Sequence, residues 1–170
     1  MPLPHTAQHH LDHSEGYLEL GMLEDARNEL DKIAPEHQSD RDVRHVRLII
    51  ATEAKDWPEA VRVASLLTEA YPDDPDWIVD LAYATRRAES LEAAHVILSD
   101  AVKRFPKSGM ILFNLGCYEA QLGNVEAAKE CVKRAIEING MFRKMALEDE
   151  DLEGIRGDIF GLAQSGTCRP

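Results

Sequence analysis

Several features that would indicate a particular chemistry are missing from this sequence. Only three cysteines occur among 170 residues, and none stands in a CxxC pair, so neither a disulfide framework nor a cysteine-rich zinc site is indicated. Aromatic residues make up 6% of the chain, a composition closer to a helical protein than to a β-sandwich. Glycine-rich phosphate loops, HExxH and GxSxG motifs are absent, so we expect neither enzyme activity nor a cofactor.

Long hydrophobic runs and basic blocks are also missing. No stretch reaches the roughly 20 apolar residues that a membrane-spanning helix needs. The opening residues Met-Pro-Leu-Pro-His lack the basic and then apolar pattern of an ordinary signal peptide. The formal net charge is −12, which repels phosphate backbones and anionic lipids. We therefore expect a cytoplasmic protein that binds neither nucleic acid nor membranes.

The sequence does contain a short phrase that recurs every 34 residues. The phrase ends in an alanine each time, at Ala26, Ala60, Ala94 and Ala128. The residues four and seven positions after each alanine are apolar in every copy, so three apolar side chains lie on one face of a helix. Turn-forming or N-capping residues precede these helices, at Gly21, Asp56, Ser90 and Asn124. The period predicts repeated pairs of helices.

Each repeat is expected to consist of a helix, a tight turn and a second helix that ends near a proline or glycine. The predicted repeats span residues 7–40, 41–74, 75–108 and 109–142. A flexible N-terminus over residues 1–6 precedes them. Apolar residues continue at helix-like intervals after the last repeat, which predicts a capping helical segment over 143–163, broken near Glu150. Residues 164–170 are predicted to form a flexible tail.

The repeat resembles the tetratricopeptide repeat (TPR) family, whose unit has this length and a W-x2-L-G-x2-Y, A-x3-F, P signature. The fourth repeat carries the best match, with Leu112-x2-Leu115-Gly116 followed by Ala128 and Val132. The second and third repeats end in Tyr71-Pro72 and Phe105-Pro106. The resemblance implies an all-α fold, a right-handed α-solenoid of four TPR-like units with a C-terminal capping helix.

The resemblance also implies a binding role, because first helices line the concave side of such solenoids. Its groove-facing columns fall on Leu11, Asp12, Glu15, His45, Val46, Ile49, Val79, Asp80, Tyr83, Arg87, Phe113, Asn114, Cys117 and Gln121. We expect a protein or peptide ligand in this groove, with Tyr83 and Phe113 as its main contacts. The alternative is that these residues pack against the chain's own termini or a second copy. The expected state is a monomer or a weak homodimer.

Two other functions remain open at this stage. Translocator chaperones of type III secretion are similar in size, acidity and repeat content, so a dedicated chaperone of a secreted client is one alternative to a general scaffold. A metal-binding protein is the other, because His5, His9 and His13 are spaced i, i+4, i+8 and would share one helical face. The cysteines are interpreted as small apolar fillers rather than nucleophiles.

Overall fold

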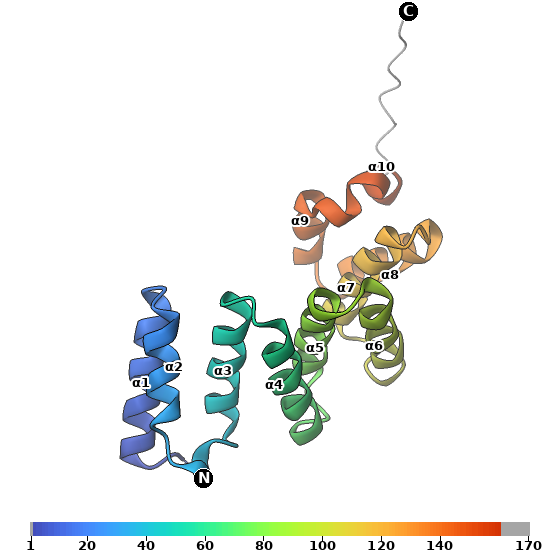
Figure 1. Ribbon diagram of the computed structural model, residues 1–170. Helices are drawn as coiled ribbons and strands as arrows, with labels where there is room; N and C mark the ends of the chain where they lie inside the picture. Colours follow the sequence, from blue (N-terminus) through green and yellow to red (C-terminus); the bar gives the residue numbers. More distant parts are fainter. Residues whose placement is uncertain (1, 161–170) are drawn as a thin grey trace, which may run out of the picture. The chain divides into compact units, whose positions relative to one another are not determined.

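The computed structural model describes residues 2–160 as helices joined by short turns, with no strand in that range (Figure 1). The elements are α1 (His5–Glu19), α2 (Leu23–Asp31), the 3-10 helix η1 (Pro35–His37), α3 (Arg41–Glu53), α4 (Trp57–Ala70), α5 (Pro75–Ala88), α6 (Leu91–Arg104), α7 (Gly109–Gln121), α8 (Val125–Ile138), α9 (Met141–Glu148), the 3-10 helix η2 (Glu150–Ile155) and α10 (Arg156–Phe160). The predicted all-α fold class is confirmed. The chain forms two compact units, Met1–Ala88 and Glu89–Pro170, described here as unit 1 and unit 2.

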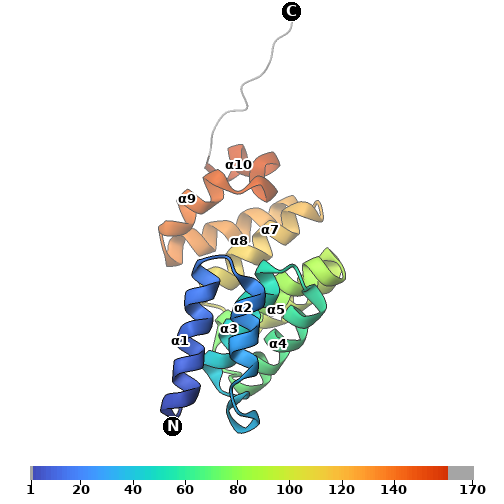
Figure 2. The same cartoon turned by 60° about the vertical axis from the view of Figure 1, so that its left-hand side comes forward.

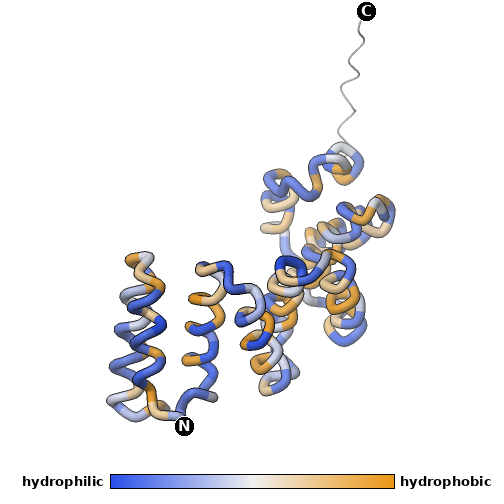
Figure 3. The backbone as a smooth tube through the Cα atoms, viewed as in Figure 1, coloured by the Kyte–Doolittle hydropathy of each residue, from blue (hydrophilic) through white to orange (hydrophobic). Residues whose placement is uncertain are grey.

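Unit 1 is built from neighbouring helices that pack side by side. The pairs α1 with α2, α3 with α4, and α4 with α5 are in contact, and α3 also packs against α1 and α2 (Figure 2). Hydrophobic and hydrophilic residues alternate along the backbone of these helices (Figure 3), as expected for helices that bury one face. Two apolar clusters result, one centred on Leu30 and Ile50 and the other on Leu67 and Trp77.

The repeat alanines lie where only a small side chain fits. Ala26, Ala60, Ala94 and Ala128 are all fully buried. In the first repeat the hydroxyl of Ser14 donates a hydrogen bond to the carbonyl oxygen of Ala26 over 2.8 Å. In the fourth repeat a Cβ atom added to Gly116 would lie 3.2 Å from the carbonyl oxygen of Ala128. First and second helices therefore cross at the alanine, as the 34-residue period predicts.

Local residue chemistry explains most of the turns. Gly21 and Gly123 have φ angles of 71° and 83°, which glycine adopts without a steric cost. Asp56 and Ser90 accept hydrogen bonds from backbone N–H groups of the helices they precede, as predicted for N-caps. Asn124 makes no such bond, and its side-chain amide donates to the Glu119 carboxylate over 2.7 Å.

The first helix begins earlier than the predicted repeat boundary. Residues 1–6 were expected to be flexible, whereas α1 begins at His5. Pro4 stands at the N-cap position with a φ of −58°, and its carbonyl oxygen accepts the N–H of Gln8 over 2.9 Å. A proline can occupy this place because it fixes φ near the helical value and has no N–H to leave unpaired.

In unit 2 the helices α7 and α8 pair closely, and α6 packs against α7. The segment α9, η2 and α10 then packs back onto this pair through buried Phe142, Leu152, Ile155 and Ile159. The chain bends at Asp149, whose side chain accepts the N–H of Asp151 over 2.9 Å, next to the predicted break at Glu150. Residues 161–163 of the predicted cap and the predicted tail over 164–170 lie outside the described residues.

Candidate binding face of unit 1

One position of each first helix is buried in all three repeats of unit 1, and this position fixes the directions in which the other side chains of the helix point. Ser14, Leu48 and Ala82 are buried, and they lie 34 residues apart at the same place in each repeat. Successive residues of an α-helix are about 100° apart around its axis. Positions −3, −2, +1 and +5 relative to this column therefore lie roughly 60–160° away from it, on a common side of the helix. We call these positions on α1, α3 and α5 the binding face.

The binding face is strongly acidic. Its members on α1 are Leu11, Asp12, Glu15 and Glu19, those on α3 are His45, Val46, Ile49 and Glu53, and those on α5 are Val79, Asp80, Tyr83 and Arg87. None of its carboxylates forms an ion pair among residues 2–160. Arg87 is the single lysine or arginine in these columns, so the face carries an uncompensated negative charge.

An exposed aromatic cluster marks the α5 part of this face. Tyr83 is 43% exposed and meets Trp57 edge-on, with ring centroids 6.0 Å apart. The guanidinium of Arg87 lies over the Trp57 ring, 5.3 Å from its centroid. Edge-on and cation–π packing favour this arrangement of the three side chains. Tyr83 thus presents an exposed aromatic ring that packs against Trp57.

Asp80 is the partly buried carboxylate of the face, one helical turn from Tyr83. Burial raises the pKa of Asp80, the negative charges of Asp76 and Asp74 act in the same direction, and the attraction of His45 opposes them. No hydrogen bond to its side chain is formed among residues 2–160. This carboxylate has therefore lost part of its hydration without gaining a hydrogen-bond donor from the described residues.

The neighbouring tryptophan also has an unused polar atom. His45 and Trp77 meet edge-on with ring centroids 5.2 Å apart. The Nε1 atom of Trp77 is buried without a hydrogen-bond partner among the described residues. Two polar groups near this face, the Trp77 indole N–H and the Asp80 carboxylate, therefore lack the hydrogen-bond partners that such groups usually have in a folded protein.

An apolar crevice lies next to the α3 part of the face. Leu18, Gly21, Leu23, Ile49 and Glu53 line it, and its volume is about 280 Å³. Ile49 is half-buried there and remains accessible from the crevice. Val46 and Leu11, in contrast, are buried in the cluster between α1 and α3 and belong to the core of unit 1. The exposed predicted residues of unit 1 are therefore Asp12, Glu15, His45, Tyr83 and Arg87, and the half-buried ones are Ile49, Val79 and Asp80.

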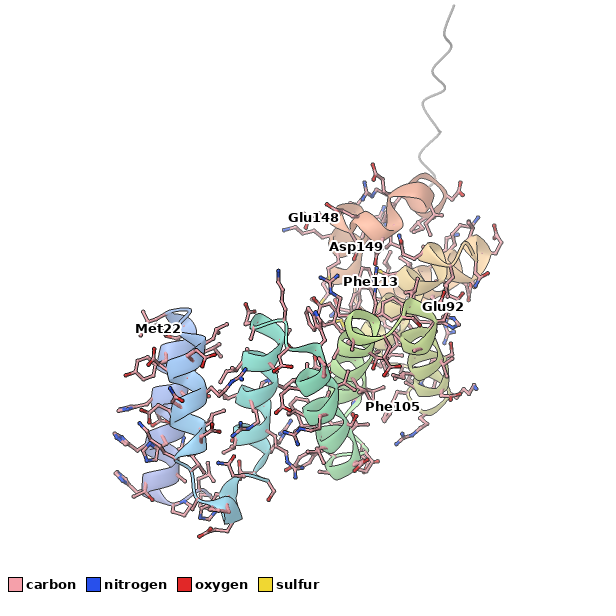
Figure 4. The ribbon with its side chains drawn as sticks, viewed as in Figure 1. Met22, Glu92, Phe105, Phe113, Glu148 and Asp149 are labelled. Atoms are coloured by element: carbon pink, nitrogen blue, oxygen red, sulfur yellow. The ribbon has the colours of Figure 1, made fainter. Side chains whose placement is uncertain are left out.

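The predicted residues of unit 2 meet the chain's own C-terminal segment. Phe113, labelled in Figure 4, is 3% exposed. It stacks on Phe142 with ring centroids 5.4 Å apart. The thiol of Cys117 lies 3.6 Å from the Asp149 carboxylate, and the amide of Gln121 donates to the carbonyl oxygen of Asp151 over 3.2 Å. Phe113 and Cys117 consequently offer almost no surface to a ligand in this conformation.

Asn114 is held within its own helix, where its amide donates to the carbonyl oxygen of Met110 over 3.0 Å. The expectation of Phe113 as an exposed anchor therefore differs from the observed packing. The physical reason is that the covering segment packs on α7 through η2 as well as on α8. Phe113, Cys117 and Gln121 instead contact the chain's own C-terminal segment, which is the alternative stated for the groove residues.

Sequence reasoning missed two residues that pack against the binding face. They are the tryptophans of the chain: Trp57 packs edge-on against Tyr83, and Trp77 packs edge-on against His45. Trp57 stands three residues before the repeat alanine, where the other repeats have Leu23, Leu91 and Val125. The large aromatic ring of Trp57, at a position that is aliphatic in the other repeats, is the sequence signal that could have identified this residue.

The N-terminal histidines do not assemble a metal site in the described chain. His9 and His13 lie together, with ring centroids 4.0 Å apart, and both are exposed on α1. No group of three or more His, Cys, Asp or Glu side chains suited to a metal ion is present among residues 2–160, and so His5 does not complete one.

One histidine of unit 2 has a serine and a carboxylate beside it, but not in a catalytic order. Nε2 of His95 lies 2.8 Å from Glu119 and 3.4 Å from the Ser99 hydroxyl. A nucleophilic triad needs the carboxylate and the hydroxyl on opposite ring nitrogens. Here both partners converge on the same nitrogen, so the group resembles a surface hydrogen-bond cluster. Burial also raises the pKa of Cys131, which favours its unreactive thiol form.

The 34-residue helix pairs, the buried alanine column and the all-helical chain together give the fold of the tetratricopeptide repeat proteins. Among solved structures, the chain is similar to a MamA RS-1 ArsTM double mutant, with a TM-score of 0.69, 16% identity, and coverage of 95% of this chain and 94% of that one. It is also similar to MamA residues 41 to the end from Desulfovibrio magneticus RS-1, with a TM-score of 0.68, 16% identity and 94% coverage of each chain.

A third similar structure is YrrB, described as a TPR protein with an unusual peptide-binding site. It has a TM-score of 0.63 and 15% identity over 93% of this chain and 79% of that one. No protein-family model and no curated protein matches the sequence. Within residues 2–160, every helix is too short or too polar to cross a bilayer.

Proposed function

We propose that this chain is a non-catalytic protein-interaction scaffold that holds a segment of another protein on the binding face of unit 1. The observation that carries the proposal is the exposed aromatic ring of Tyr83, which packs edge-on against Trp57 while Arg87 lies over the Trp57 ring. Tyrosine side chains contribute much of the affinity at protein interfaces, because they offer a large contact area for few rotatable bonds.

The surroundings of Tyr83 support the same function. The crevice at Ile49 supplies an apolar site on α3 of the same unit, and Asp80 supplies an acceptor without a donor. A binding site of this kind combines an apolar anchor with a few polar groups that fix orientation. The peptide-binding site named for YrrB, which shares the fold, is consistent with such a use of the repeats.

The test is a selection of random 12-residue peptides displayed on phage against the immobilised full-length protein. Synthetic versions of the selected peptides would then be titrated against wild type, Tyr83→Ala and Glu69→Ala, with binding followed by fluorescence anisotropy. Glu69 is an exposed residue of α4 outside the binding face and is the matched control. We expect Tyr83→Ala to weaken binding by about 1–3 kcal/mol and Glu69→Ala to leave it unchanged.

Circular dichroism would verify that both variants remain folded. Selected peptides that bind the folded Tyr83→Ala variant as tightly as wild type would show that the binding face has been assigned wrongly.

A further inference from the structure

The charge of the binding face restricts the kind of segment it can hold. Its five carboxylates are Asp12, Glu15, Glu19, Glu53 and Asp80. The one arginine, Arg87, already lies over the Trp57 ring, where its positive charge interacts with the aromatic face. A negatively charged ligand would be repelled by this surface, whereas a positively charged one would be drawn towards it.

Asp80 differs from the other carboxylates because it is partly buried and has no hydrogen-bond donor among the described residues. Exposed carboxylates such as Glu15 are solvated by water and gain little from a new ion pair. A partly desolvated carboxylate gains more, since a charged donor restores the interactions that burial has removed. The ring of Tyr83, one turn further along α5, offers a second favourable surface for a cation.

We infer that the protein segment bound on this face carries a lysine or arginine whose charged group pairs with Asp80 and whose alkyl stem lies against Tyr83. This inference rests on the proposed function and names the chemistry of its partner. The crevice at Ile49 suits an apolar residue of the same segment, so the expected ligand is a basic and apolar stretch. The pairing makes Asp80 a residue that determines specificity, while Tyr83 supplies contact area.

The first experiment measures the amino-acid composition of the peptides that the protein selects. Full-length wild type and Asp80→Asn would be panned in parallel against the same random peptide library. We expect wild type to enrich peptides that contain both a lysine or arginine and an apolar residue, and Asp80→Asn to lose that enrichment. Wild-type peptides without any basic bias, but still dependent on Tyr83, would overturn the inference and leave the proposed function standing. Peptides that do not depend on Tyr83 would overturn both.

A double-mutant cycle then separates one ion pair from general attraction. The lysine or arginine of a selected peptide would be replaced by norleucine, and both peptides would be titrated against wild type, Asp80→Asn and the control Glu15→Gln. We expect the peptide change to weaken binding to wild type and to Glu15→Gln at least tenfold, and to leave binding to Asp80→Asn almost unchanged. An equal loss with all three proteins would refute the assignment of the cation to Asp80.

Discussion

Asp80 illustrates how a single partly buried carboxylate can lower the stability of the chain. Its carboxyl group lies in a partly buried position of α5, where burial raises the pKa and Asp74 and Asp76 add repulsion. His45 is the neighbouring group that attracts the charged form. A carboxyl group with a raised pKa in the folded state binds protons more readily there than in the unfolded chain. Ionised Asp80 therefore reduces the free energy of unfolding as the pH rises.

The consequence is a prediction about Asp80→Asn. The asparagine keeps the shape of the side chain and removes the charge, so the variant is expected to be more stable than wild type at pH 7. The gain should shrink as the pH falls towards the ordinary pKa of aspartate, because wild type then becomes neutral as well. Urea unfolding at a series of pH values measures this difference. A variant that is less stable than wild type at neutral pH would contradict the proposed environment of Asp80.

The small residues were the part of the molecule that the sequence predicted best. Four alanines at a 34-residue spacing have a simple cause, since any larger side chain would meet the facing helix. Tyr83 and Asp80 were predicted to face the groove because the resemblance to the repeat family implied it, and in the structure Tyr83 is exposed and Asp80 half-buried. The contact of Tyr83 with Trp57 was not predicted. Trp57 stands at the start of another helix, and the 34-residue period does not show which side chains of two different helices meet.

At the scale of elements, the C-terminal segment shows where the pattern stops being informative. Its apolar residues recur at helix-like intervals, which predicts a helix with a buried side. That periodicity does not specify the surface on which the side is buried. The segment reaches α7 as well as α8, with Phe142 stacked on Phe113 and filling the space above Gly109. Predicted groove residues of the fourth repeat are covered for this reason.

Phe142 is accordingly expected to carry much of the packing between α9 and α7. The change Phe142→Ala removes a buried ring that is 4% exposed and leaves a cavity against Phe113, so it should cost about 3 kcal/mol of unfolding free energy. The adjacent residue Met141 is 54% exposed, and Met141→Ala is expected to stay within about 0.5 kcal/mol of wild type. Denaturant unfolding compares the two. Equal stabilities would mean that the segment does not pack on α7 as described.

At the scale of the whole molecule, the two units present their first helices differently. Unit 1 leaves an acidic and aromatic face open on α3 and α5, whereas the corresponding residues of α7 in unit 2 are in contact with the C-terminal segment. Among the predicted first-helix residues, those of unit 1 are therefore more accessible than Phe113 and Cys117 of unit 2. The similarity of the fold to YrrB and MamA does not choose between the two units, because at 15–16% identity it concerns the backbone and not the side chains.

The most direct test of this difference is a map of amide chemical shifts during titration with a selected peptide. The chain has a mass of 19.0 kDa, which suits two-dimensional NMR of the full-length protein. The largest shift changes are expected on α3 and α5, between His45 and Arg87, with the amides of α7 and α9 left close to their free positions. If the largest changes instead occur on α7 and α9, the ligand displaces the C-terminal segment, and unit 1 is not the binding site.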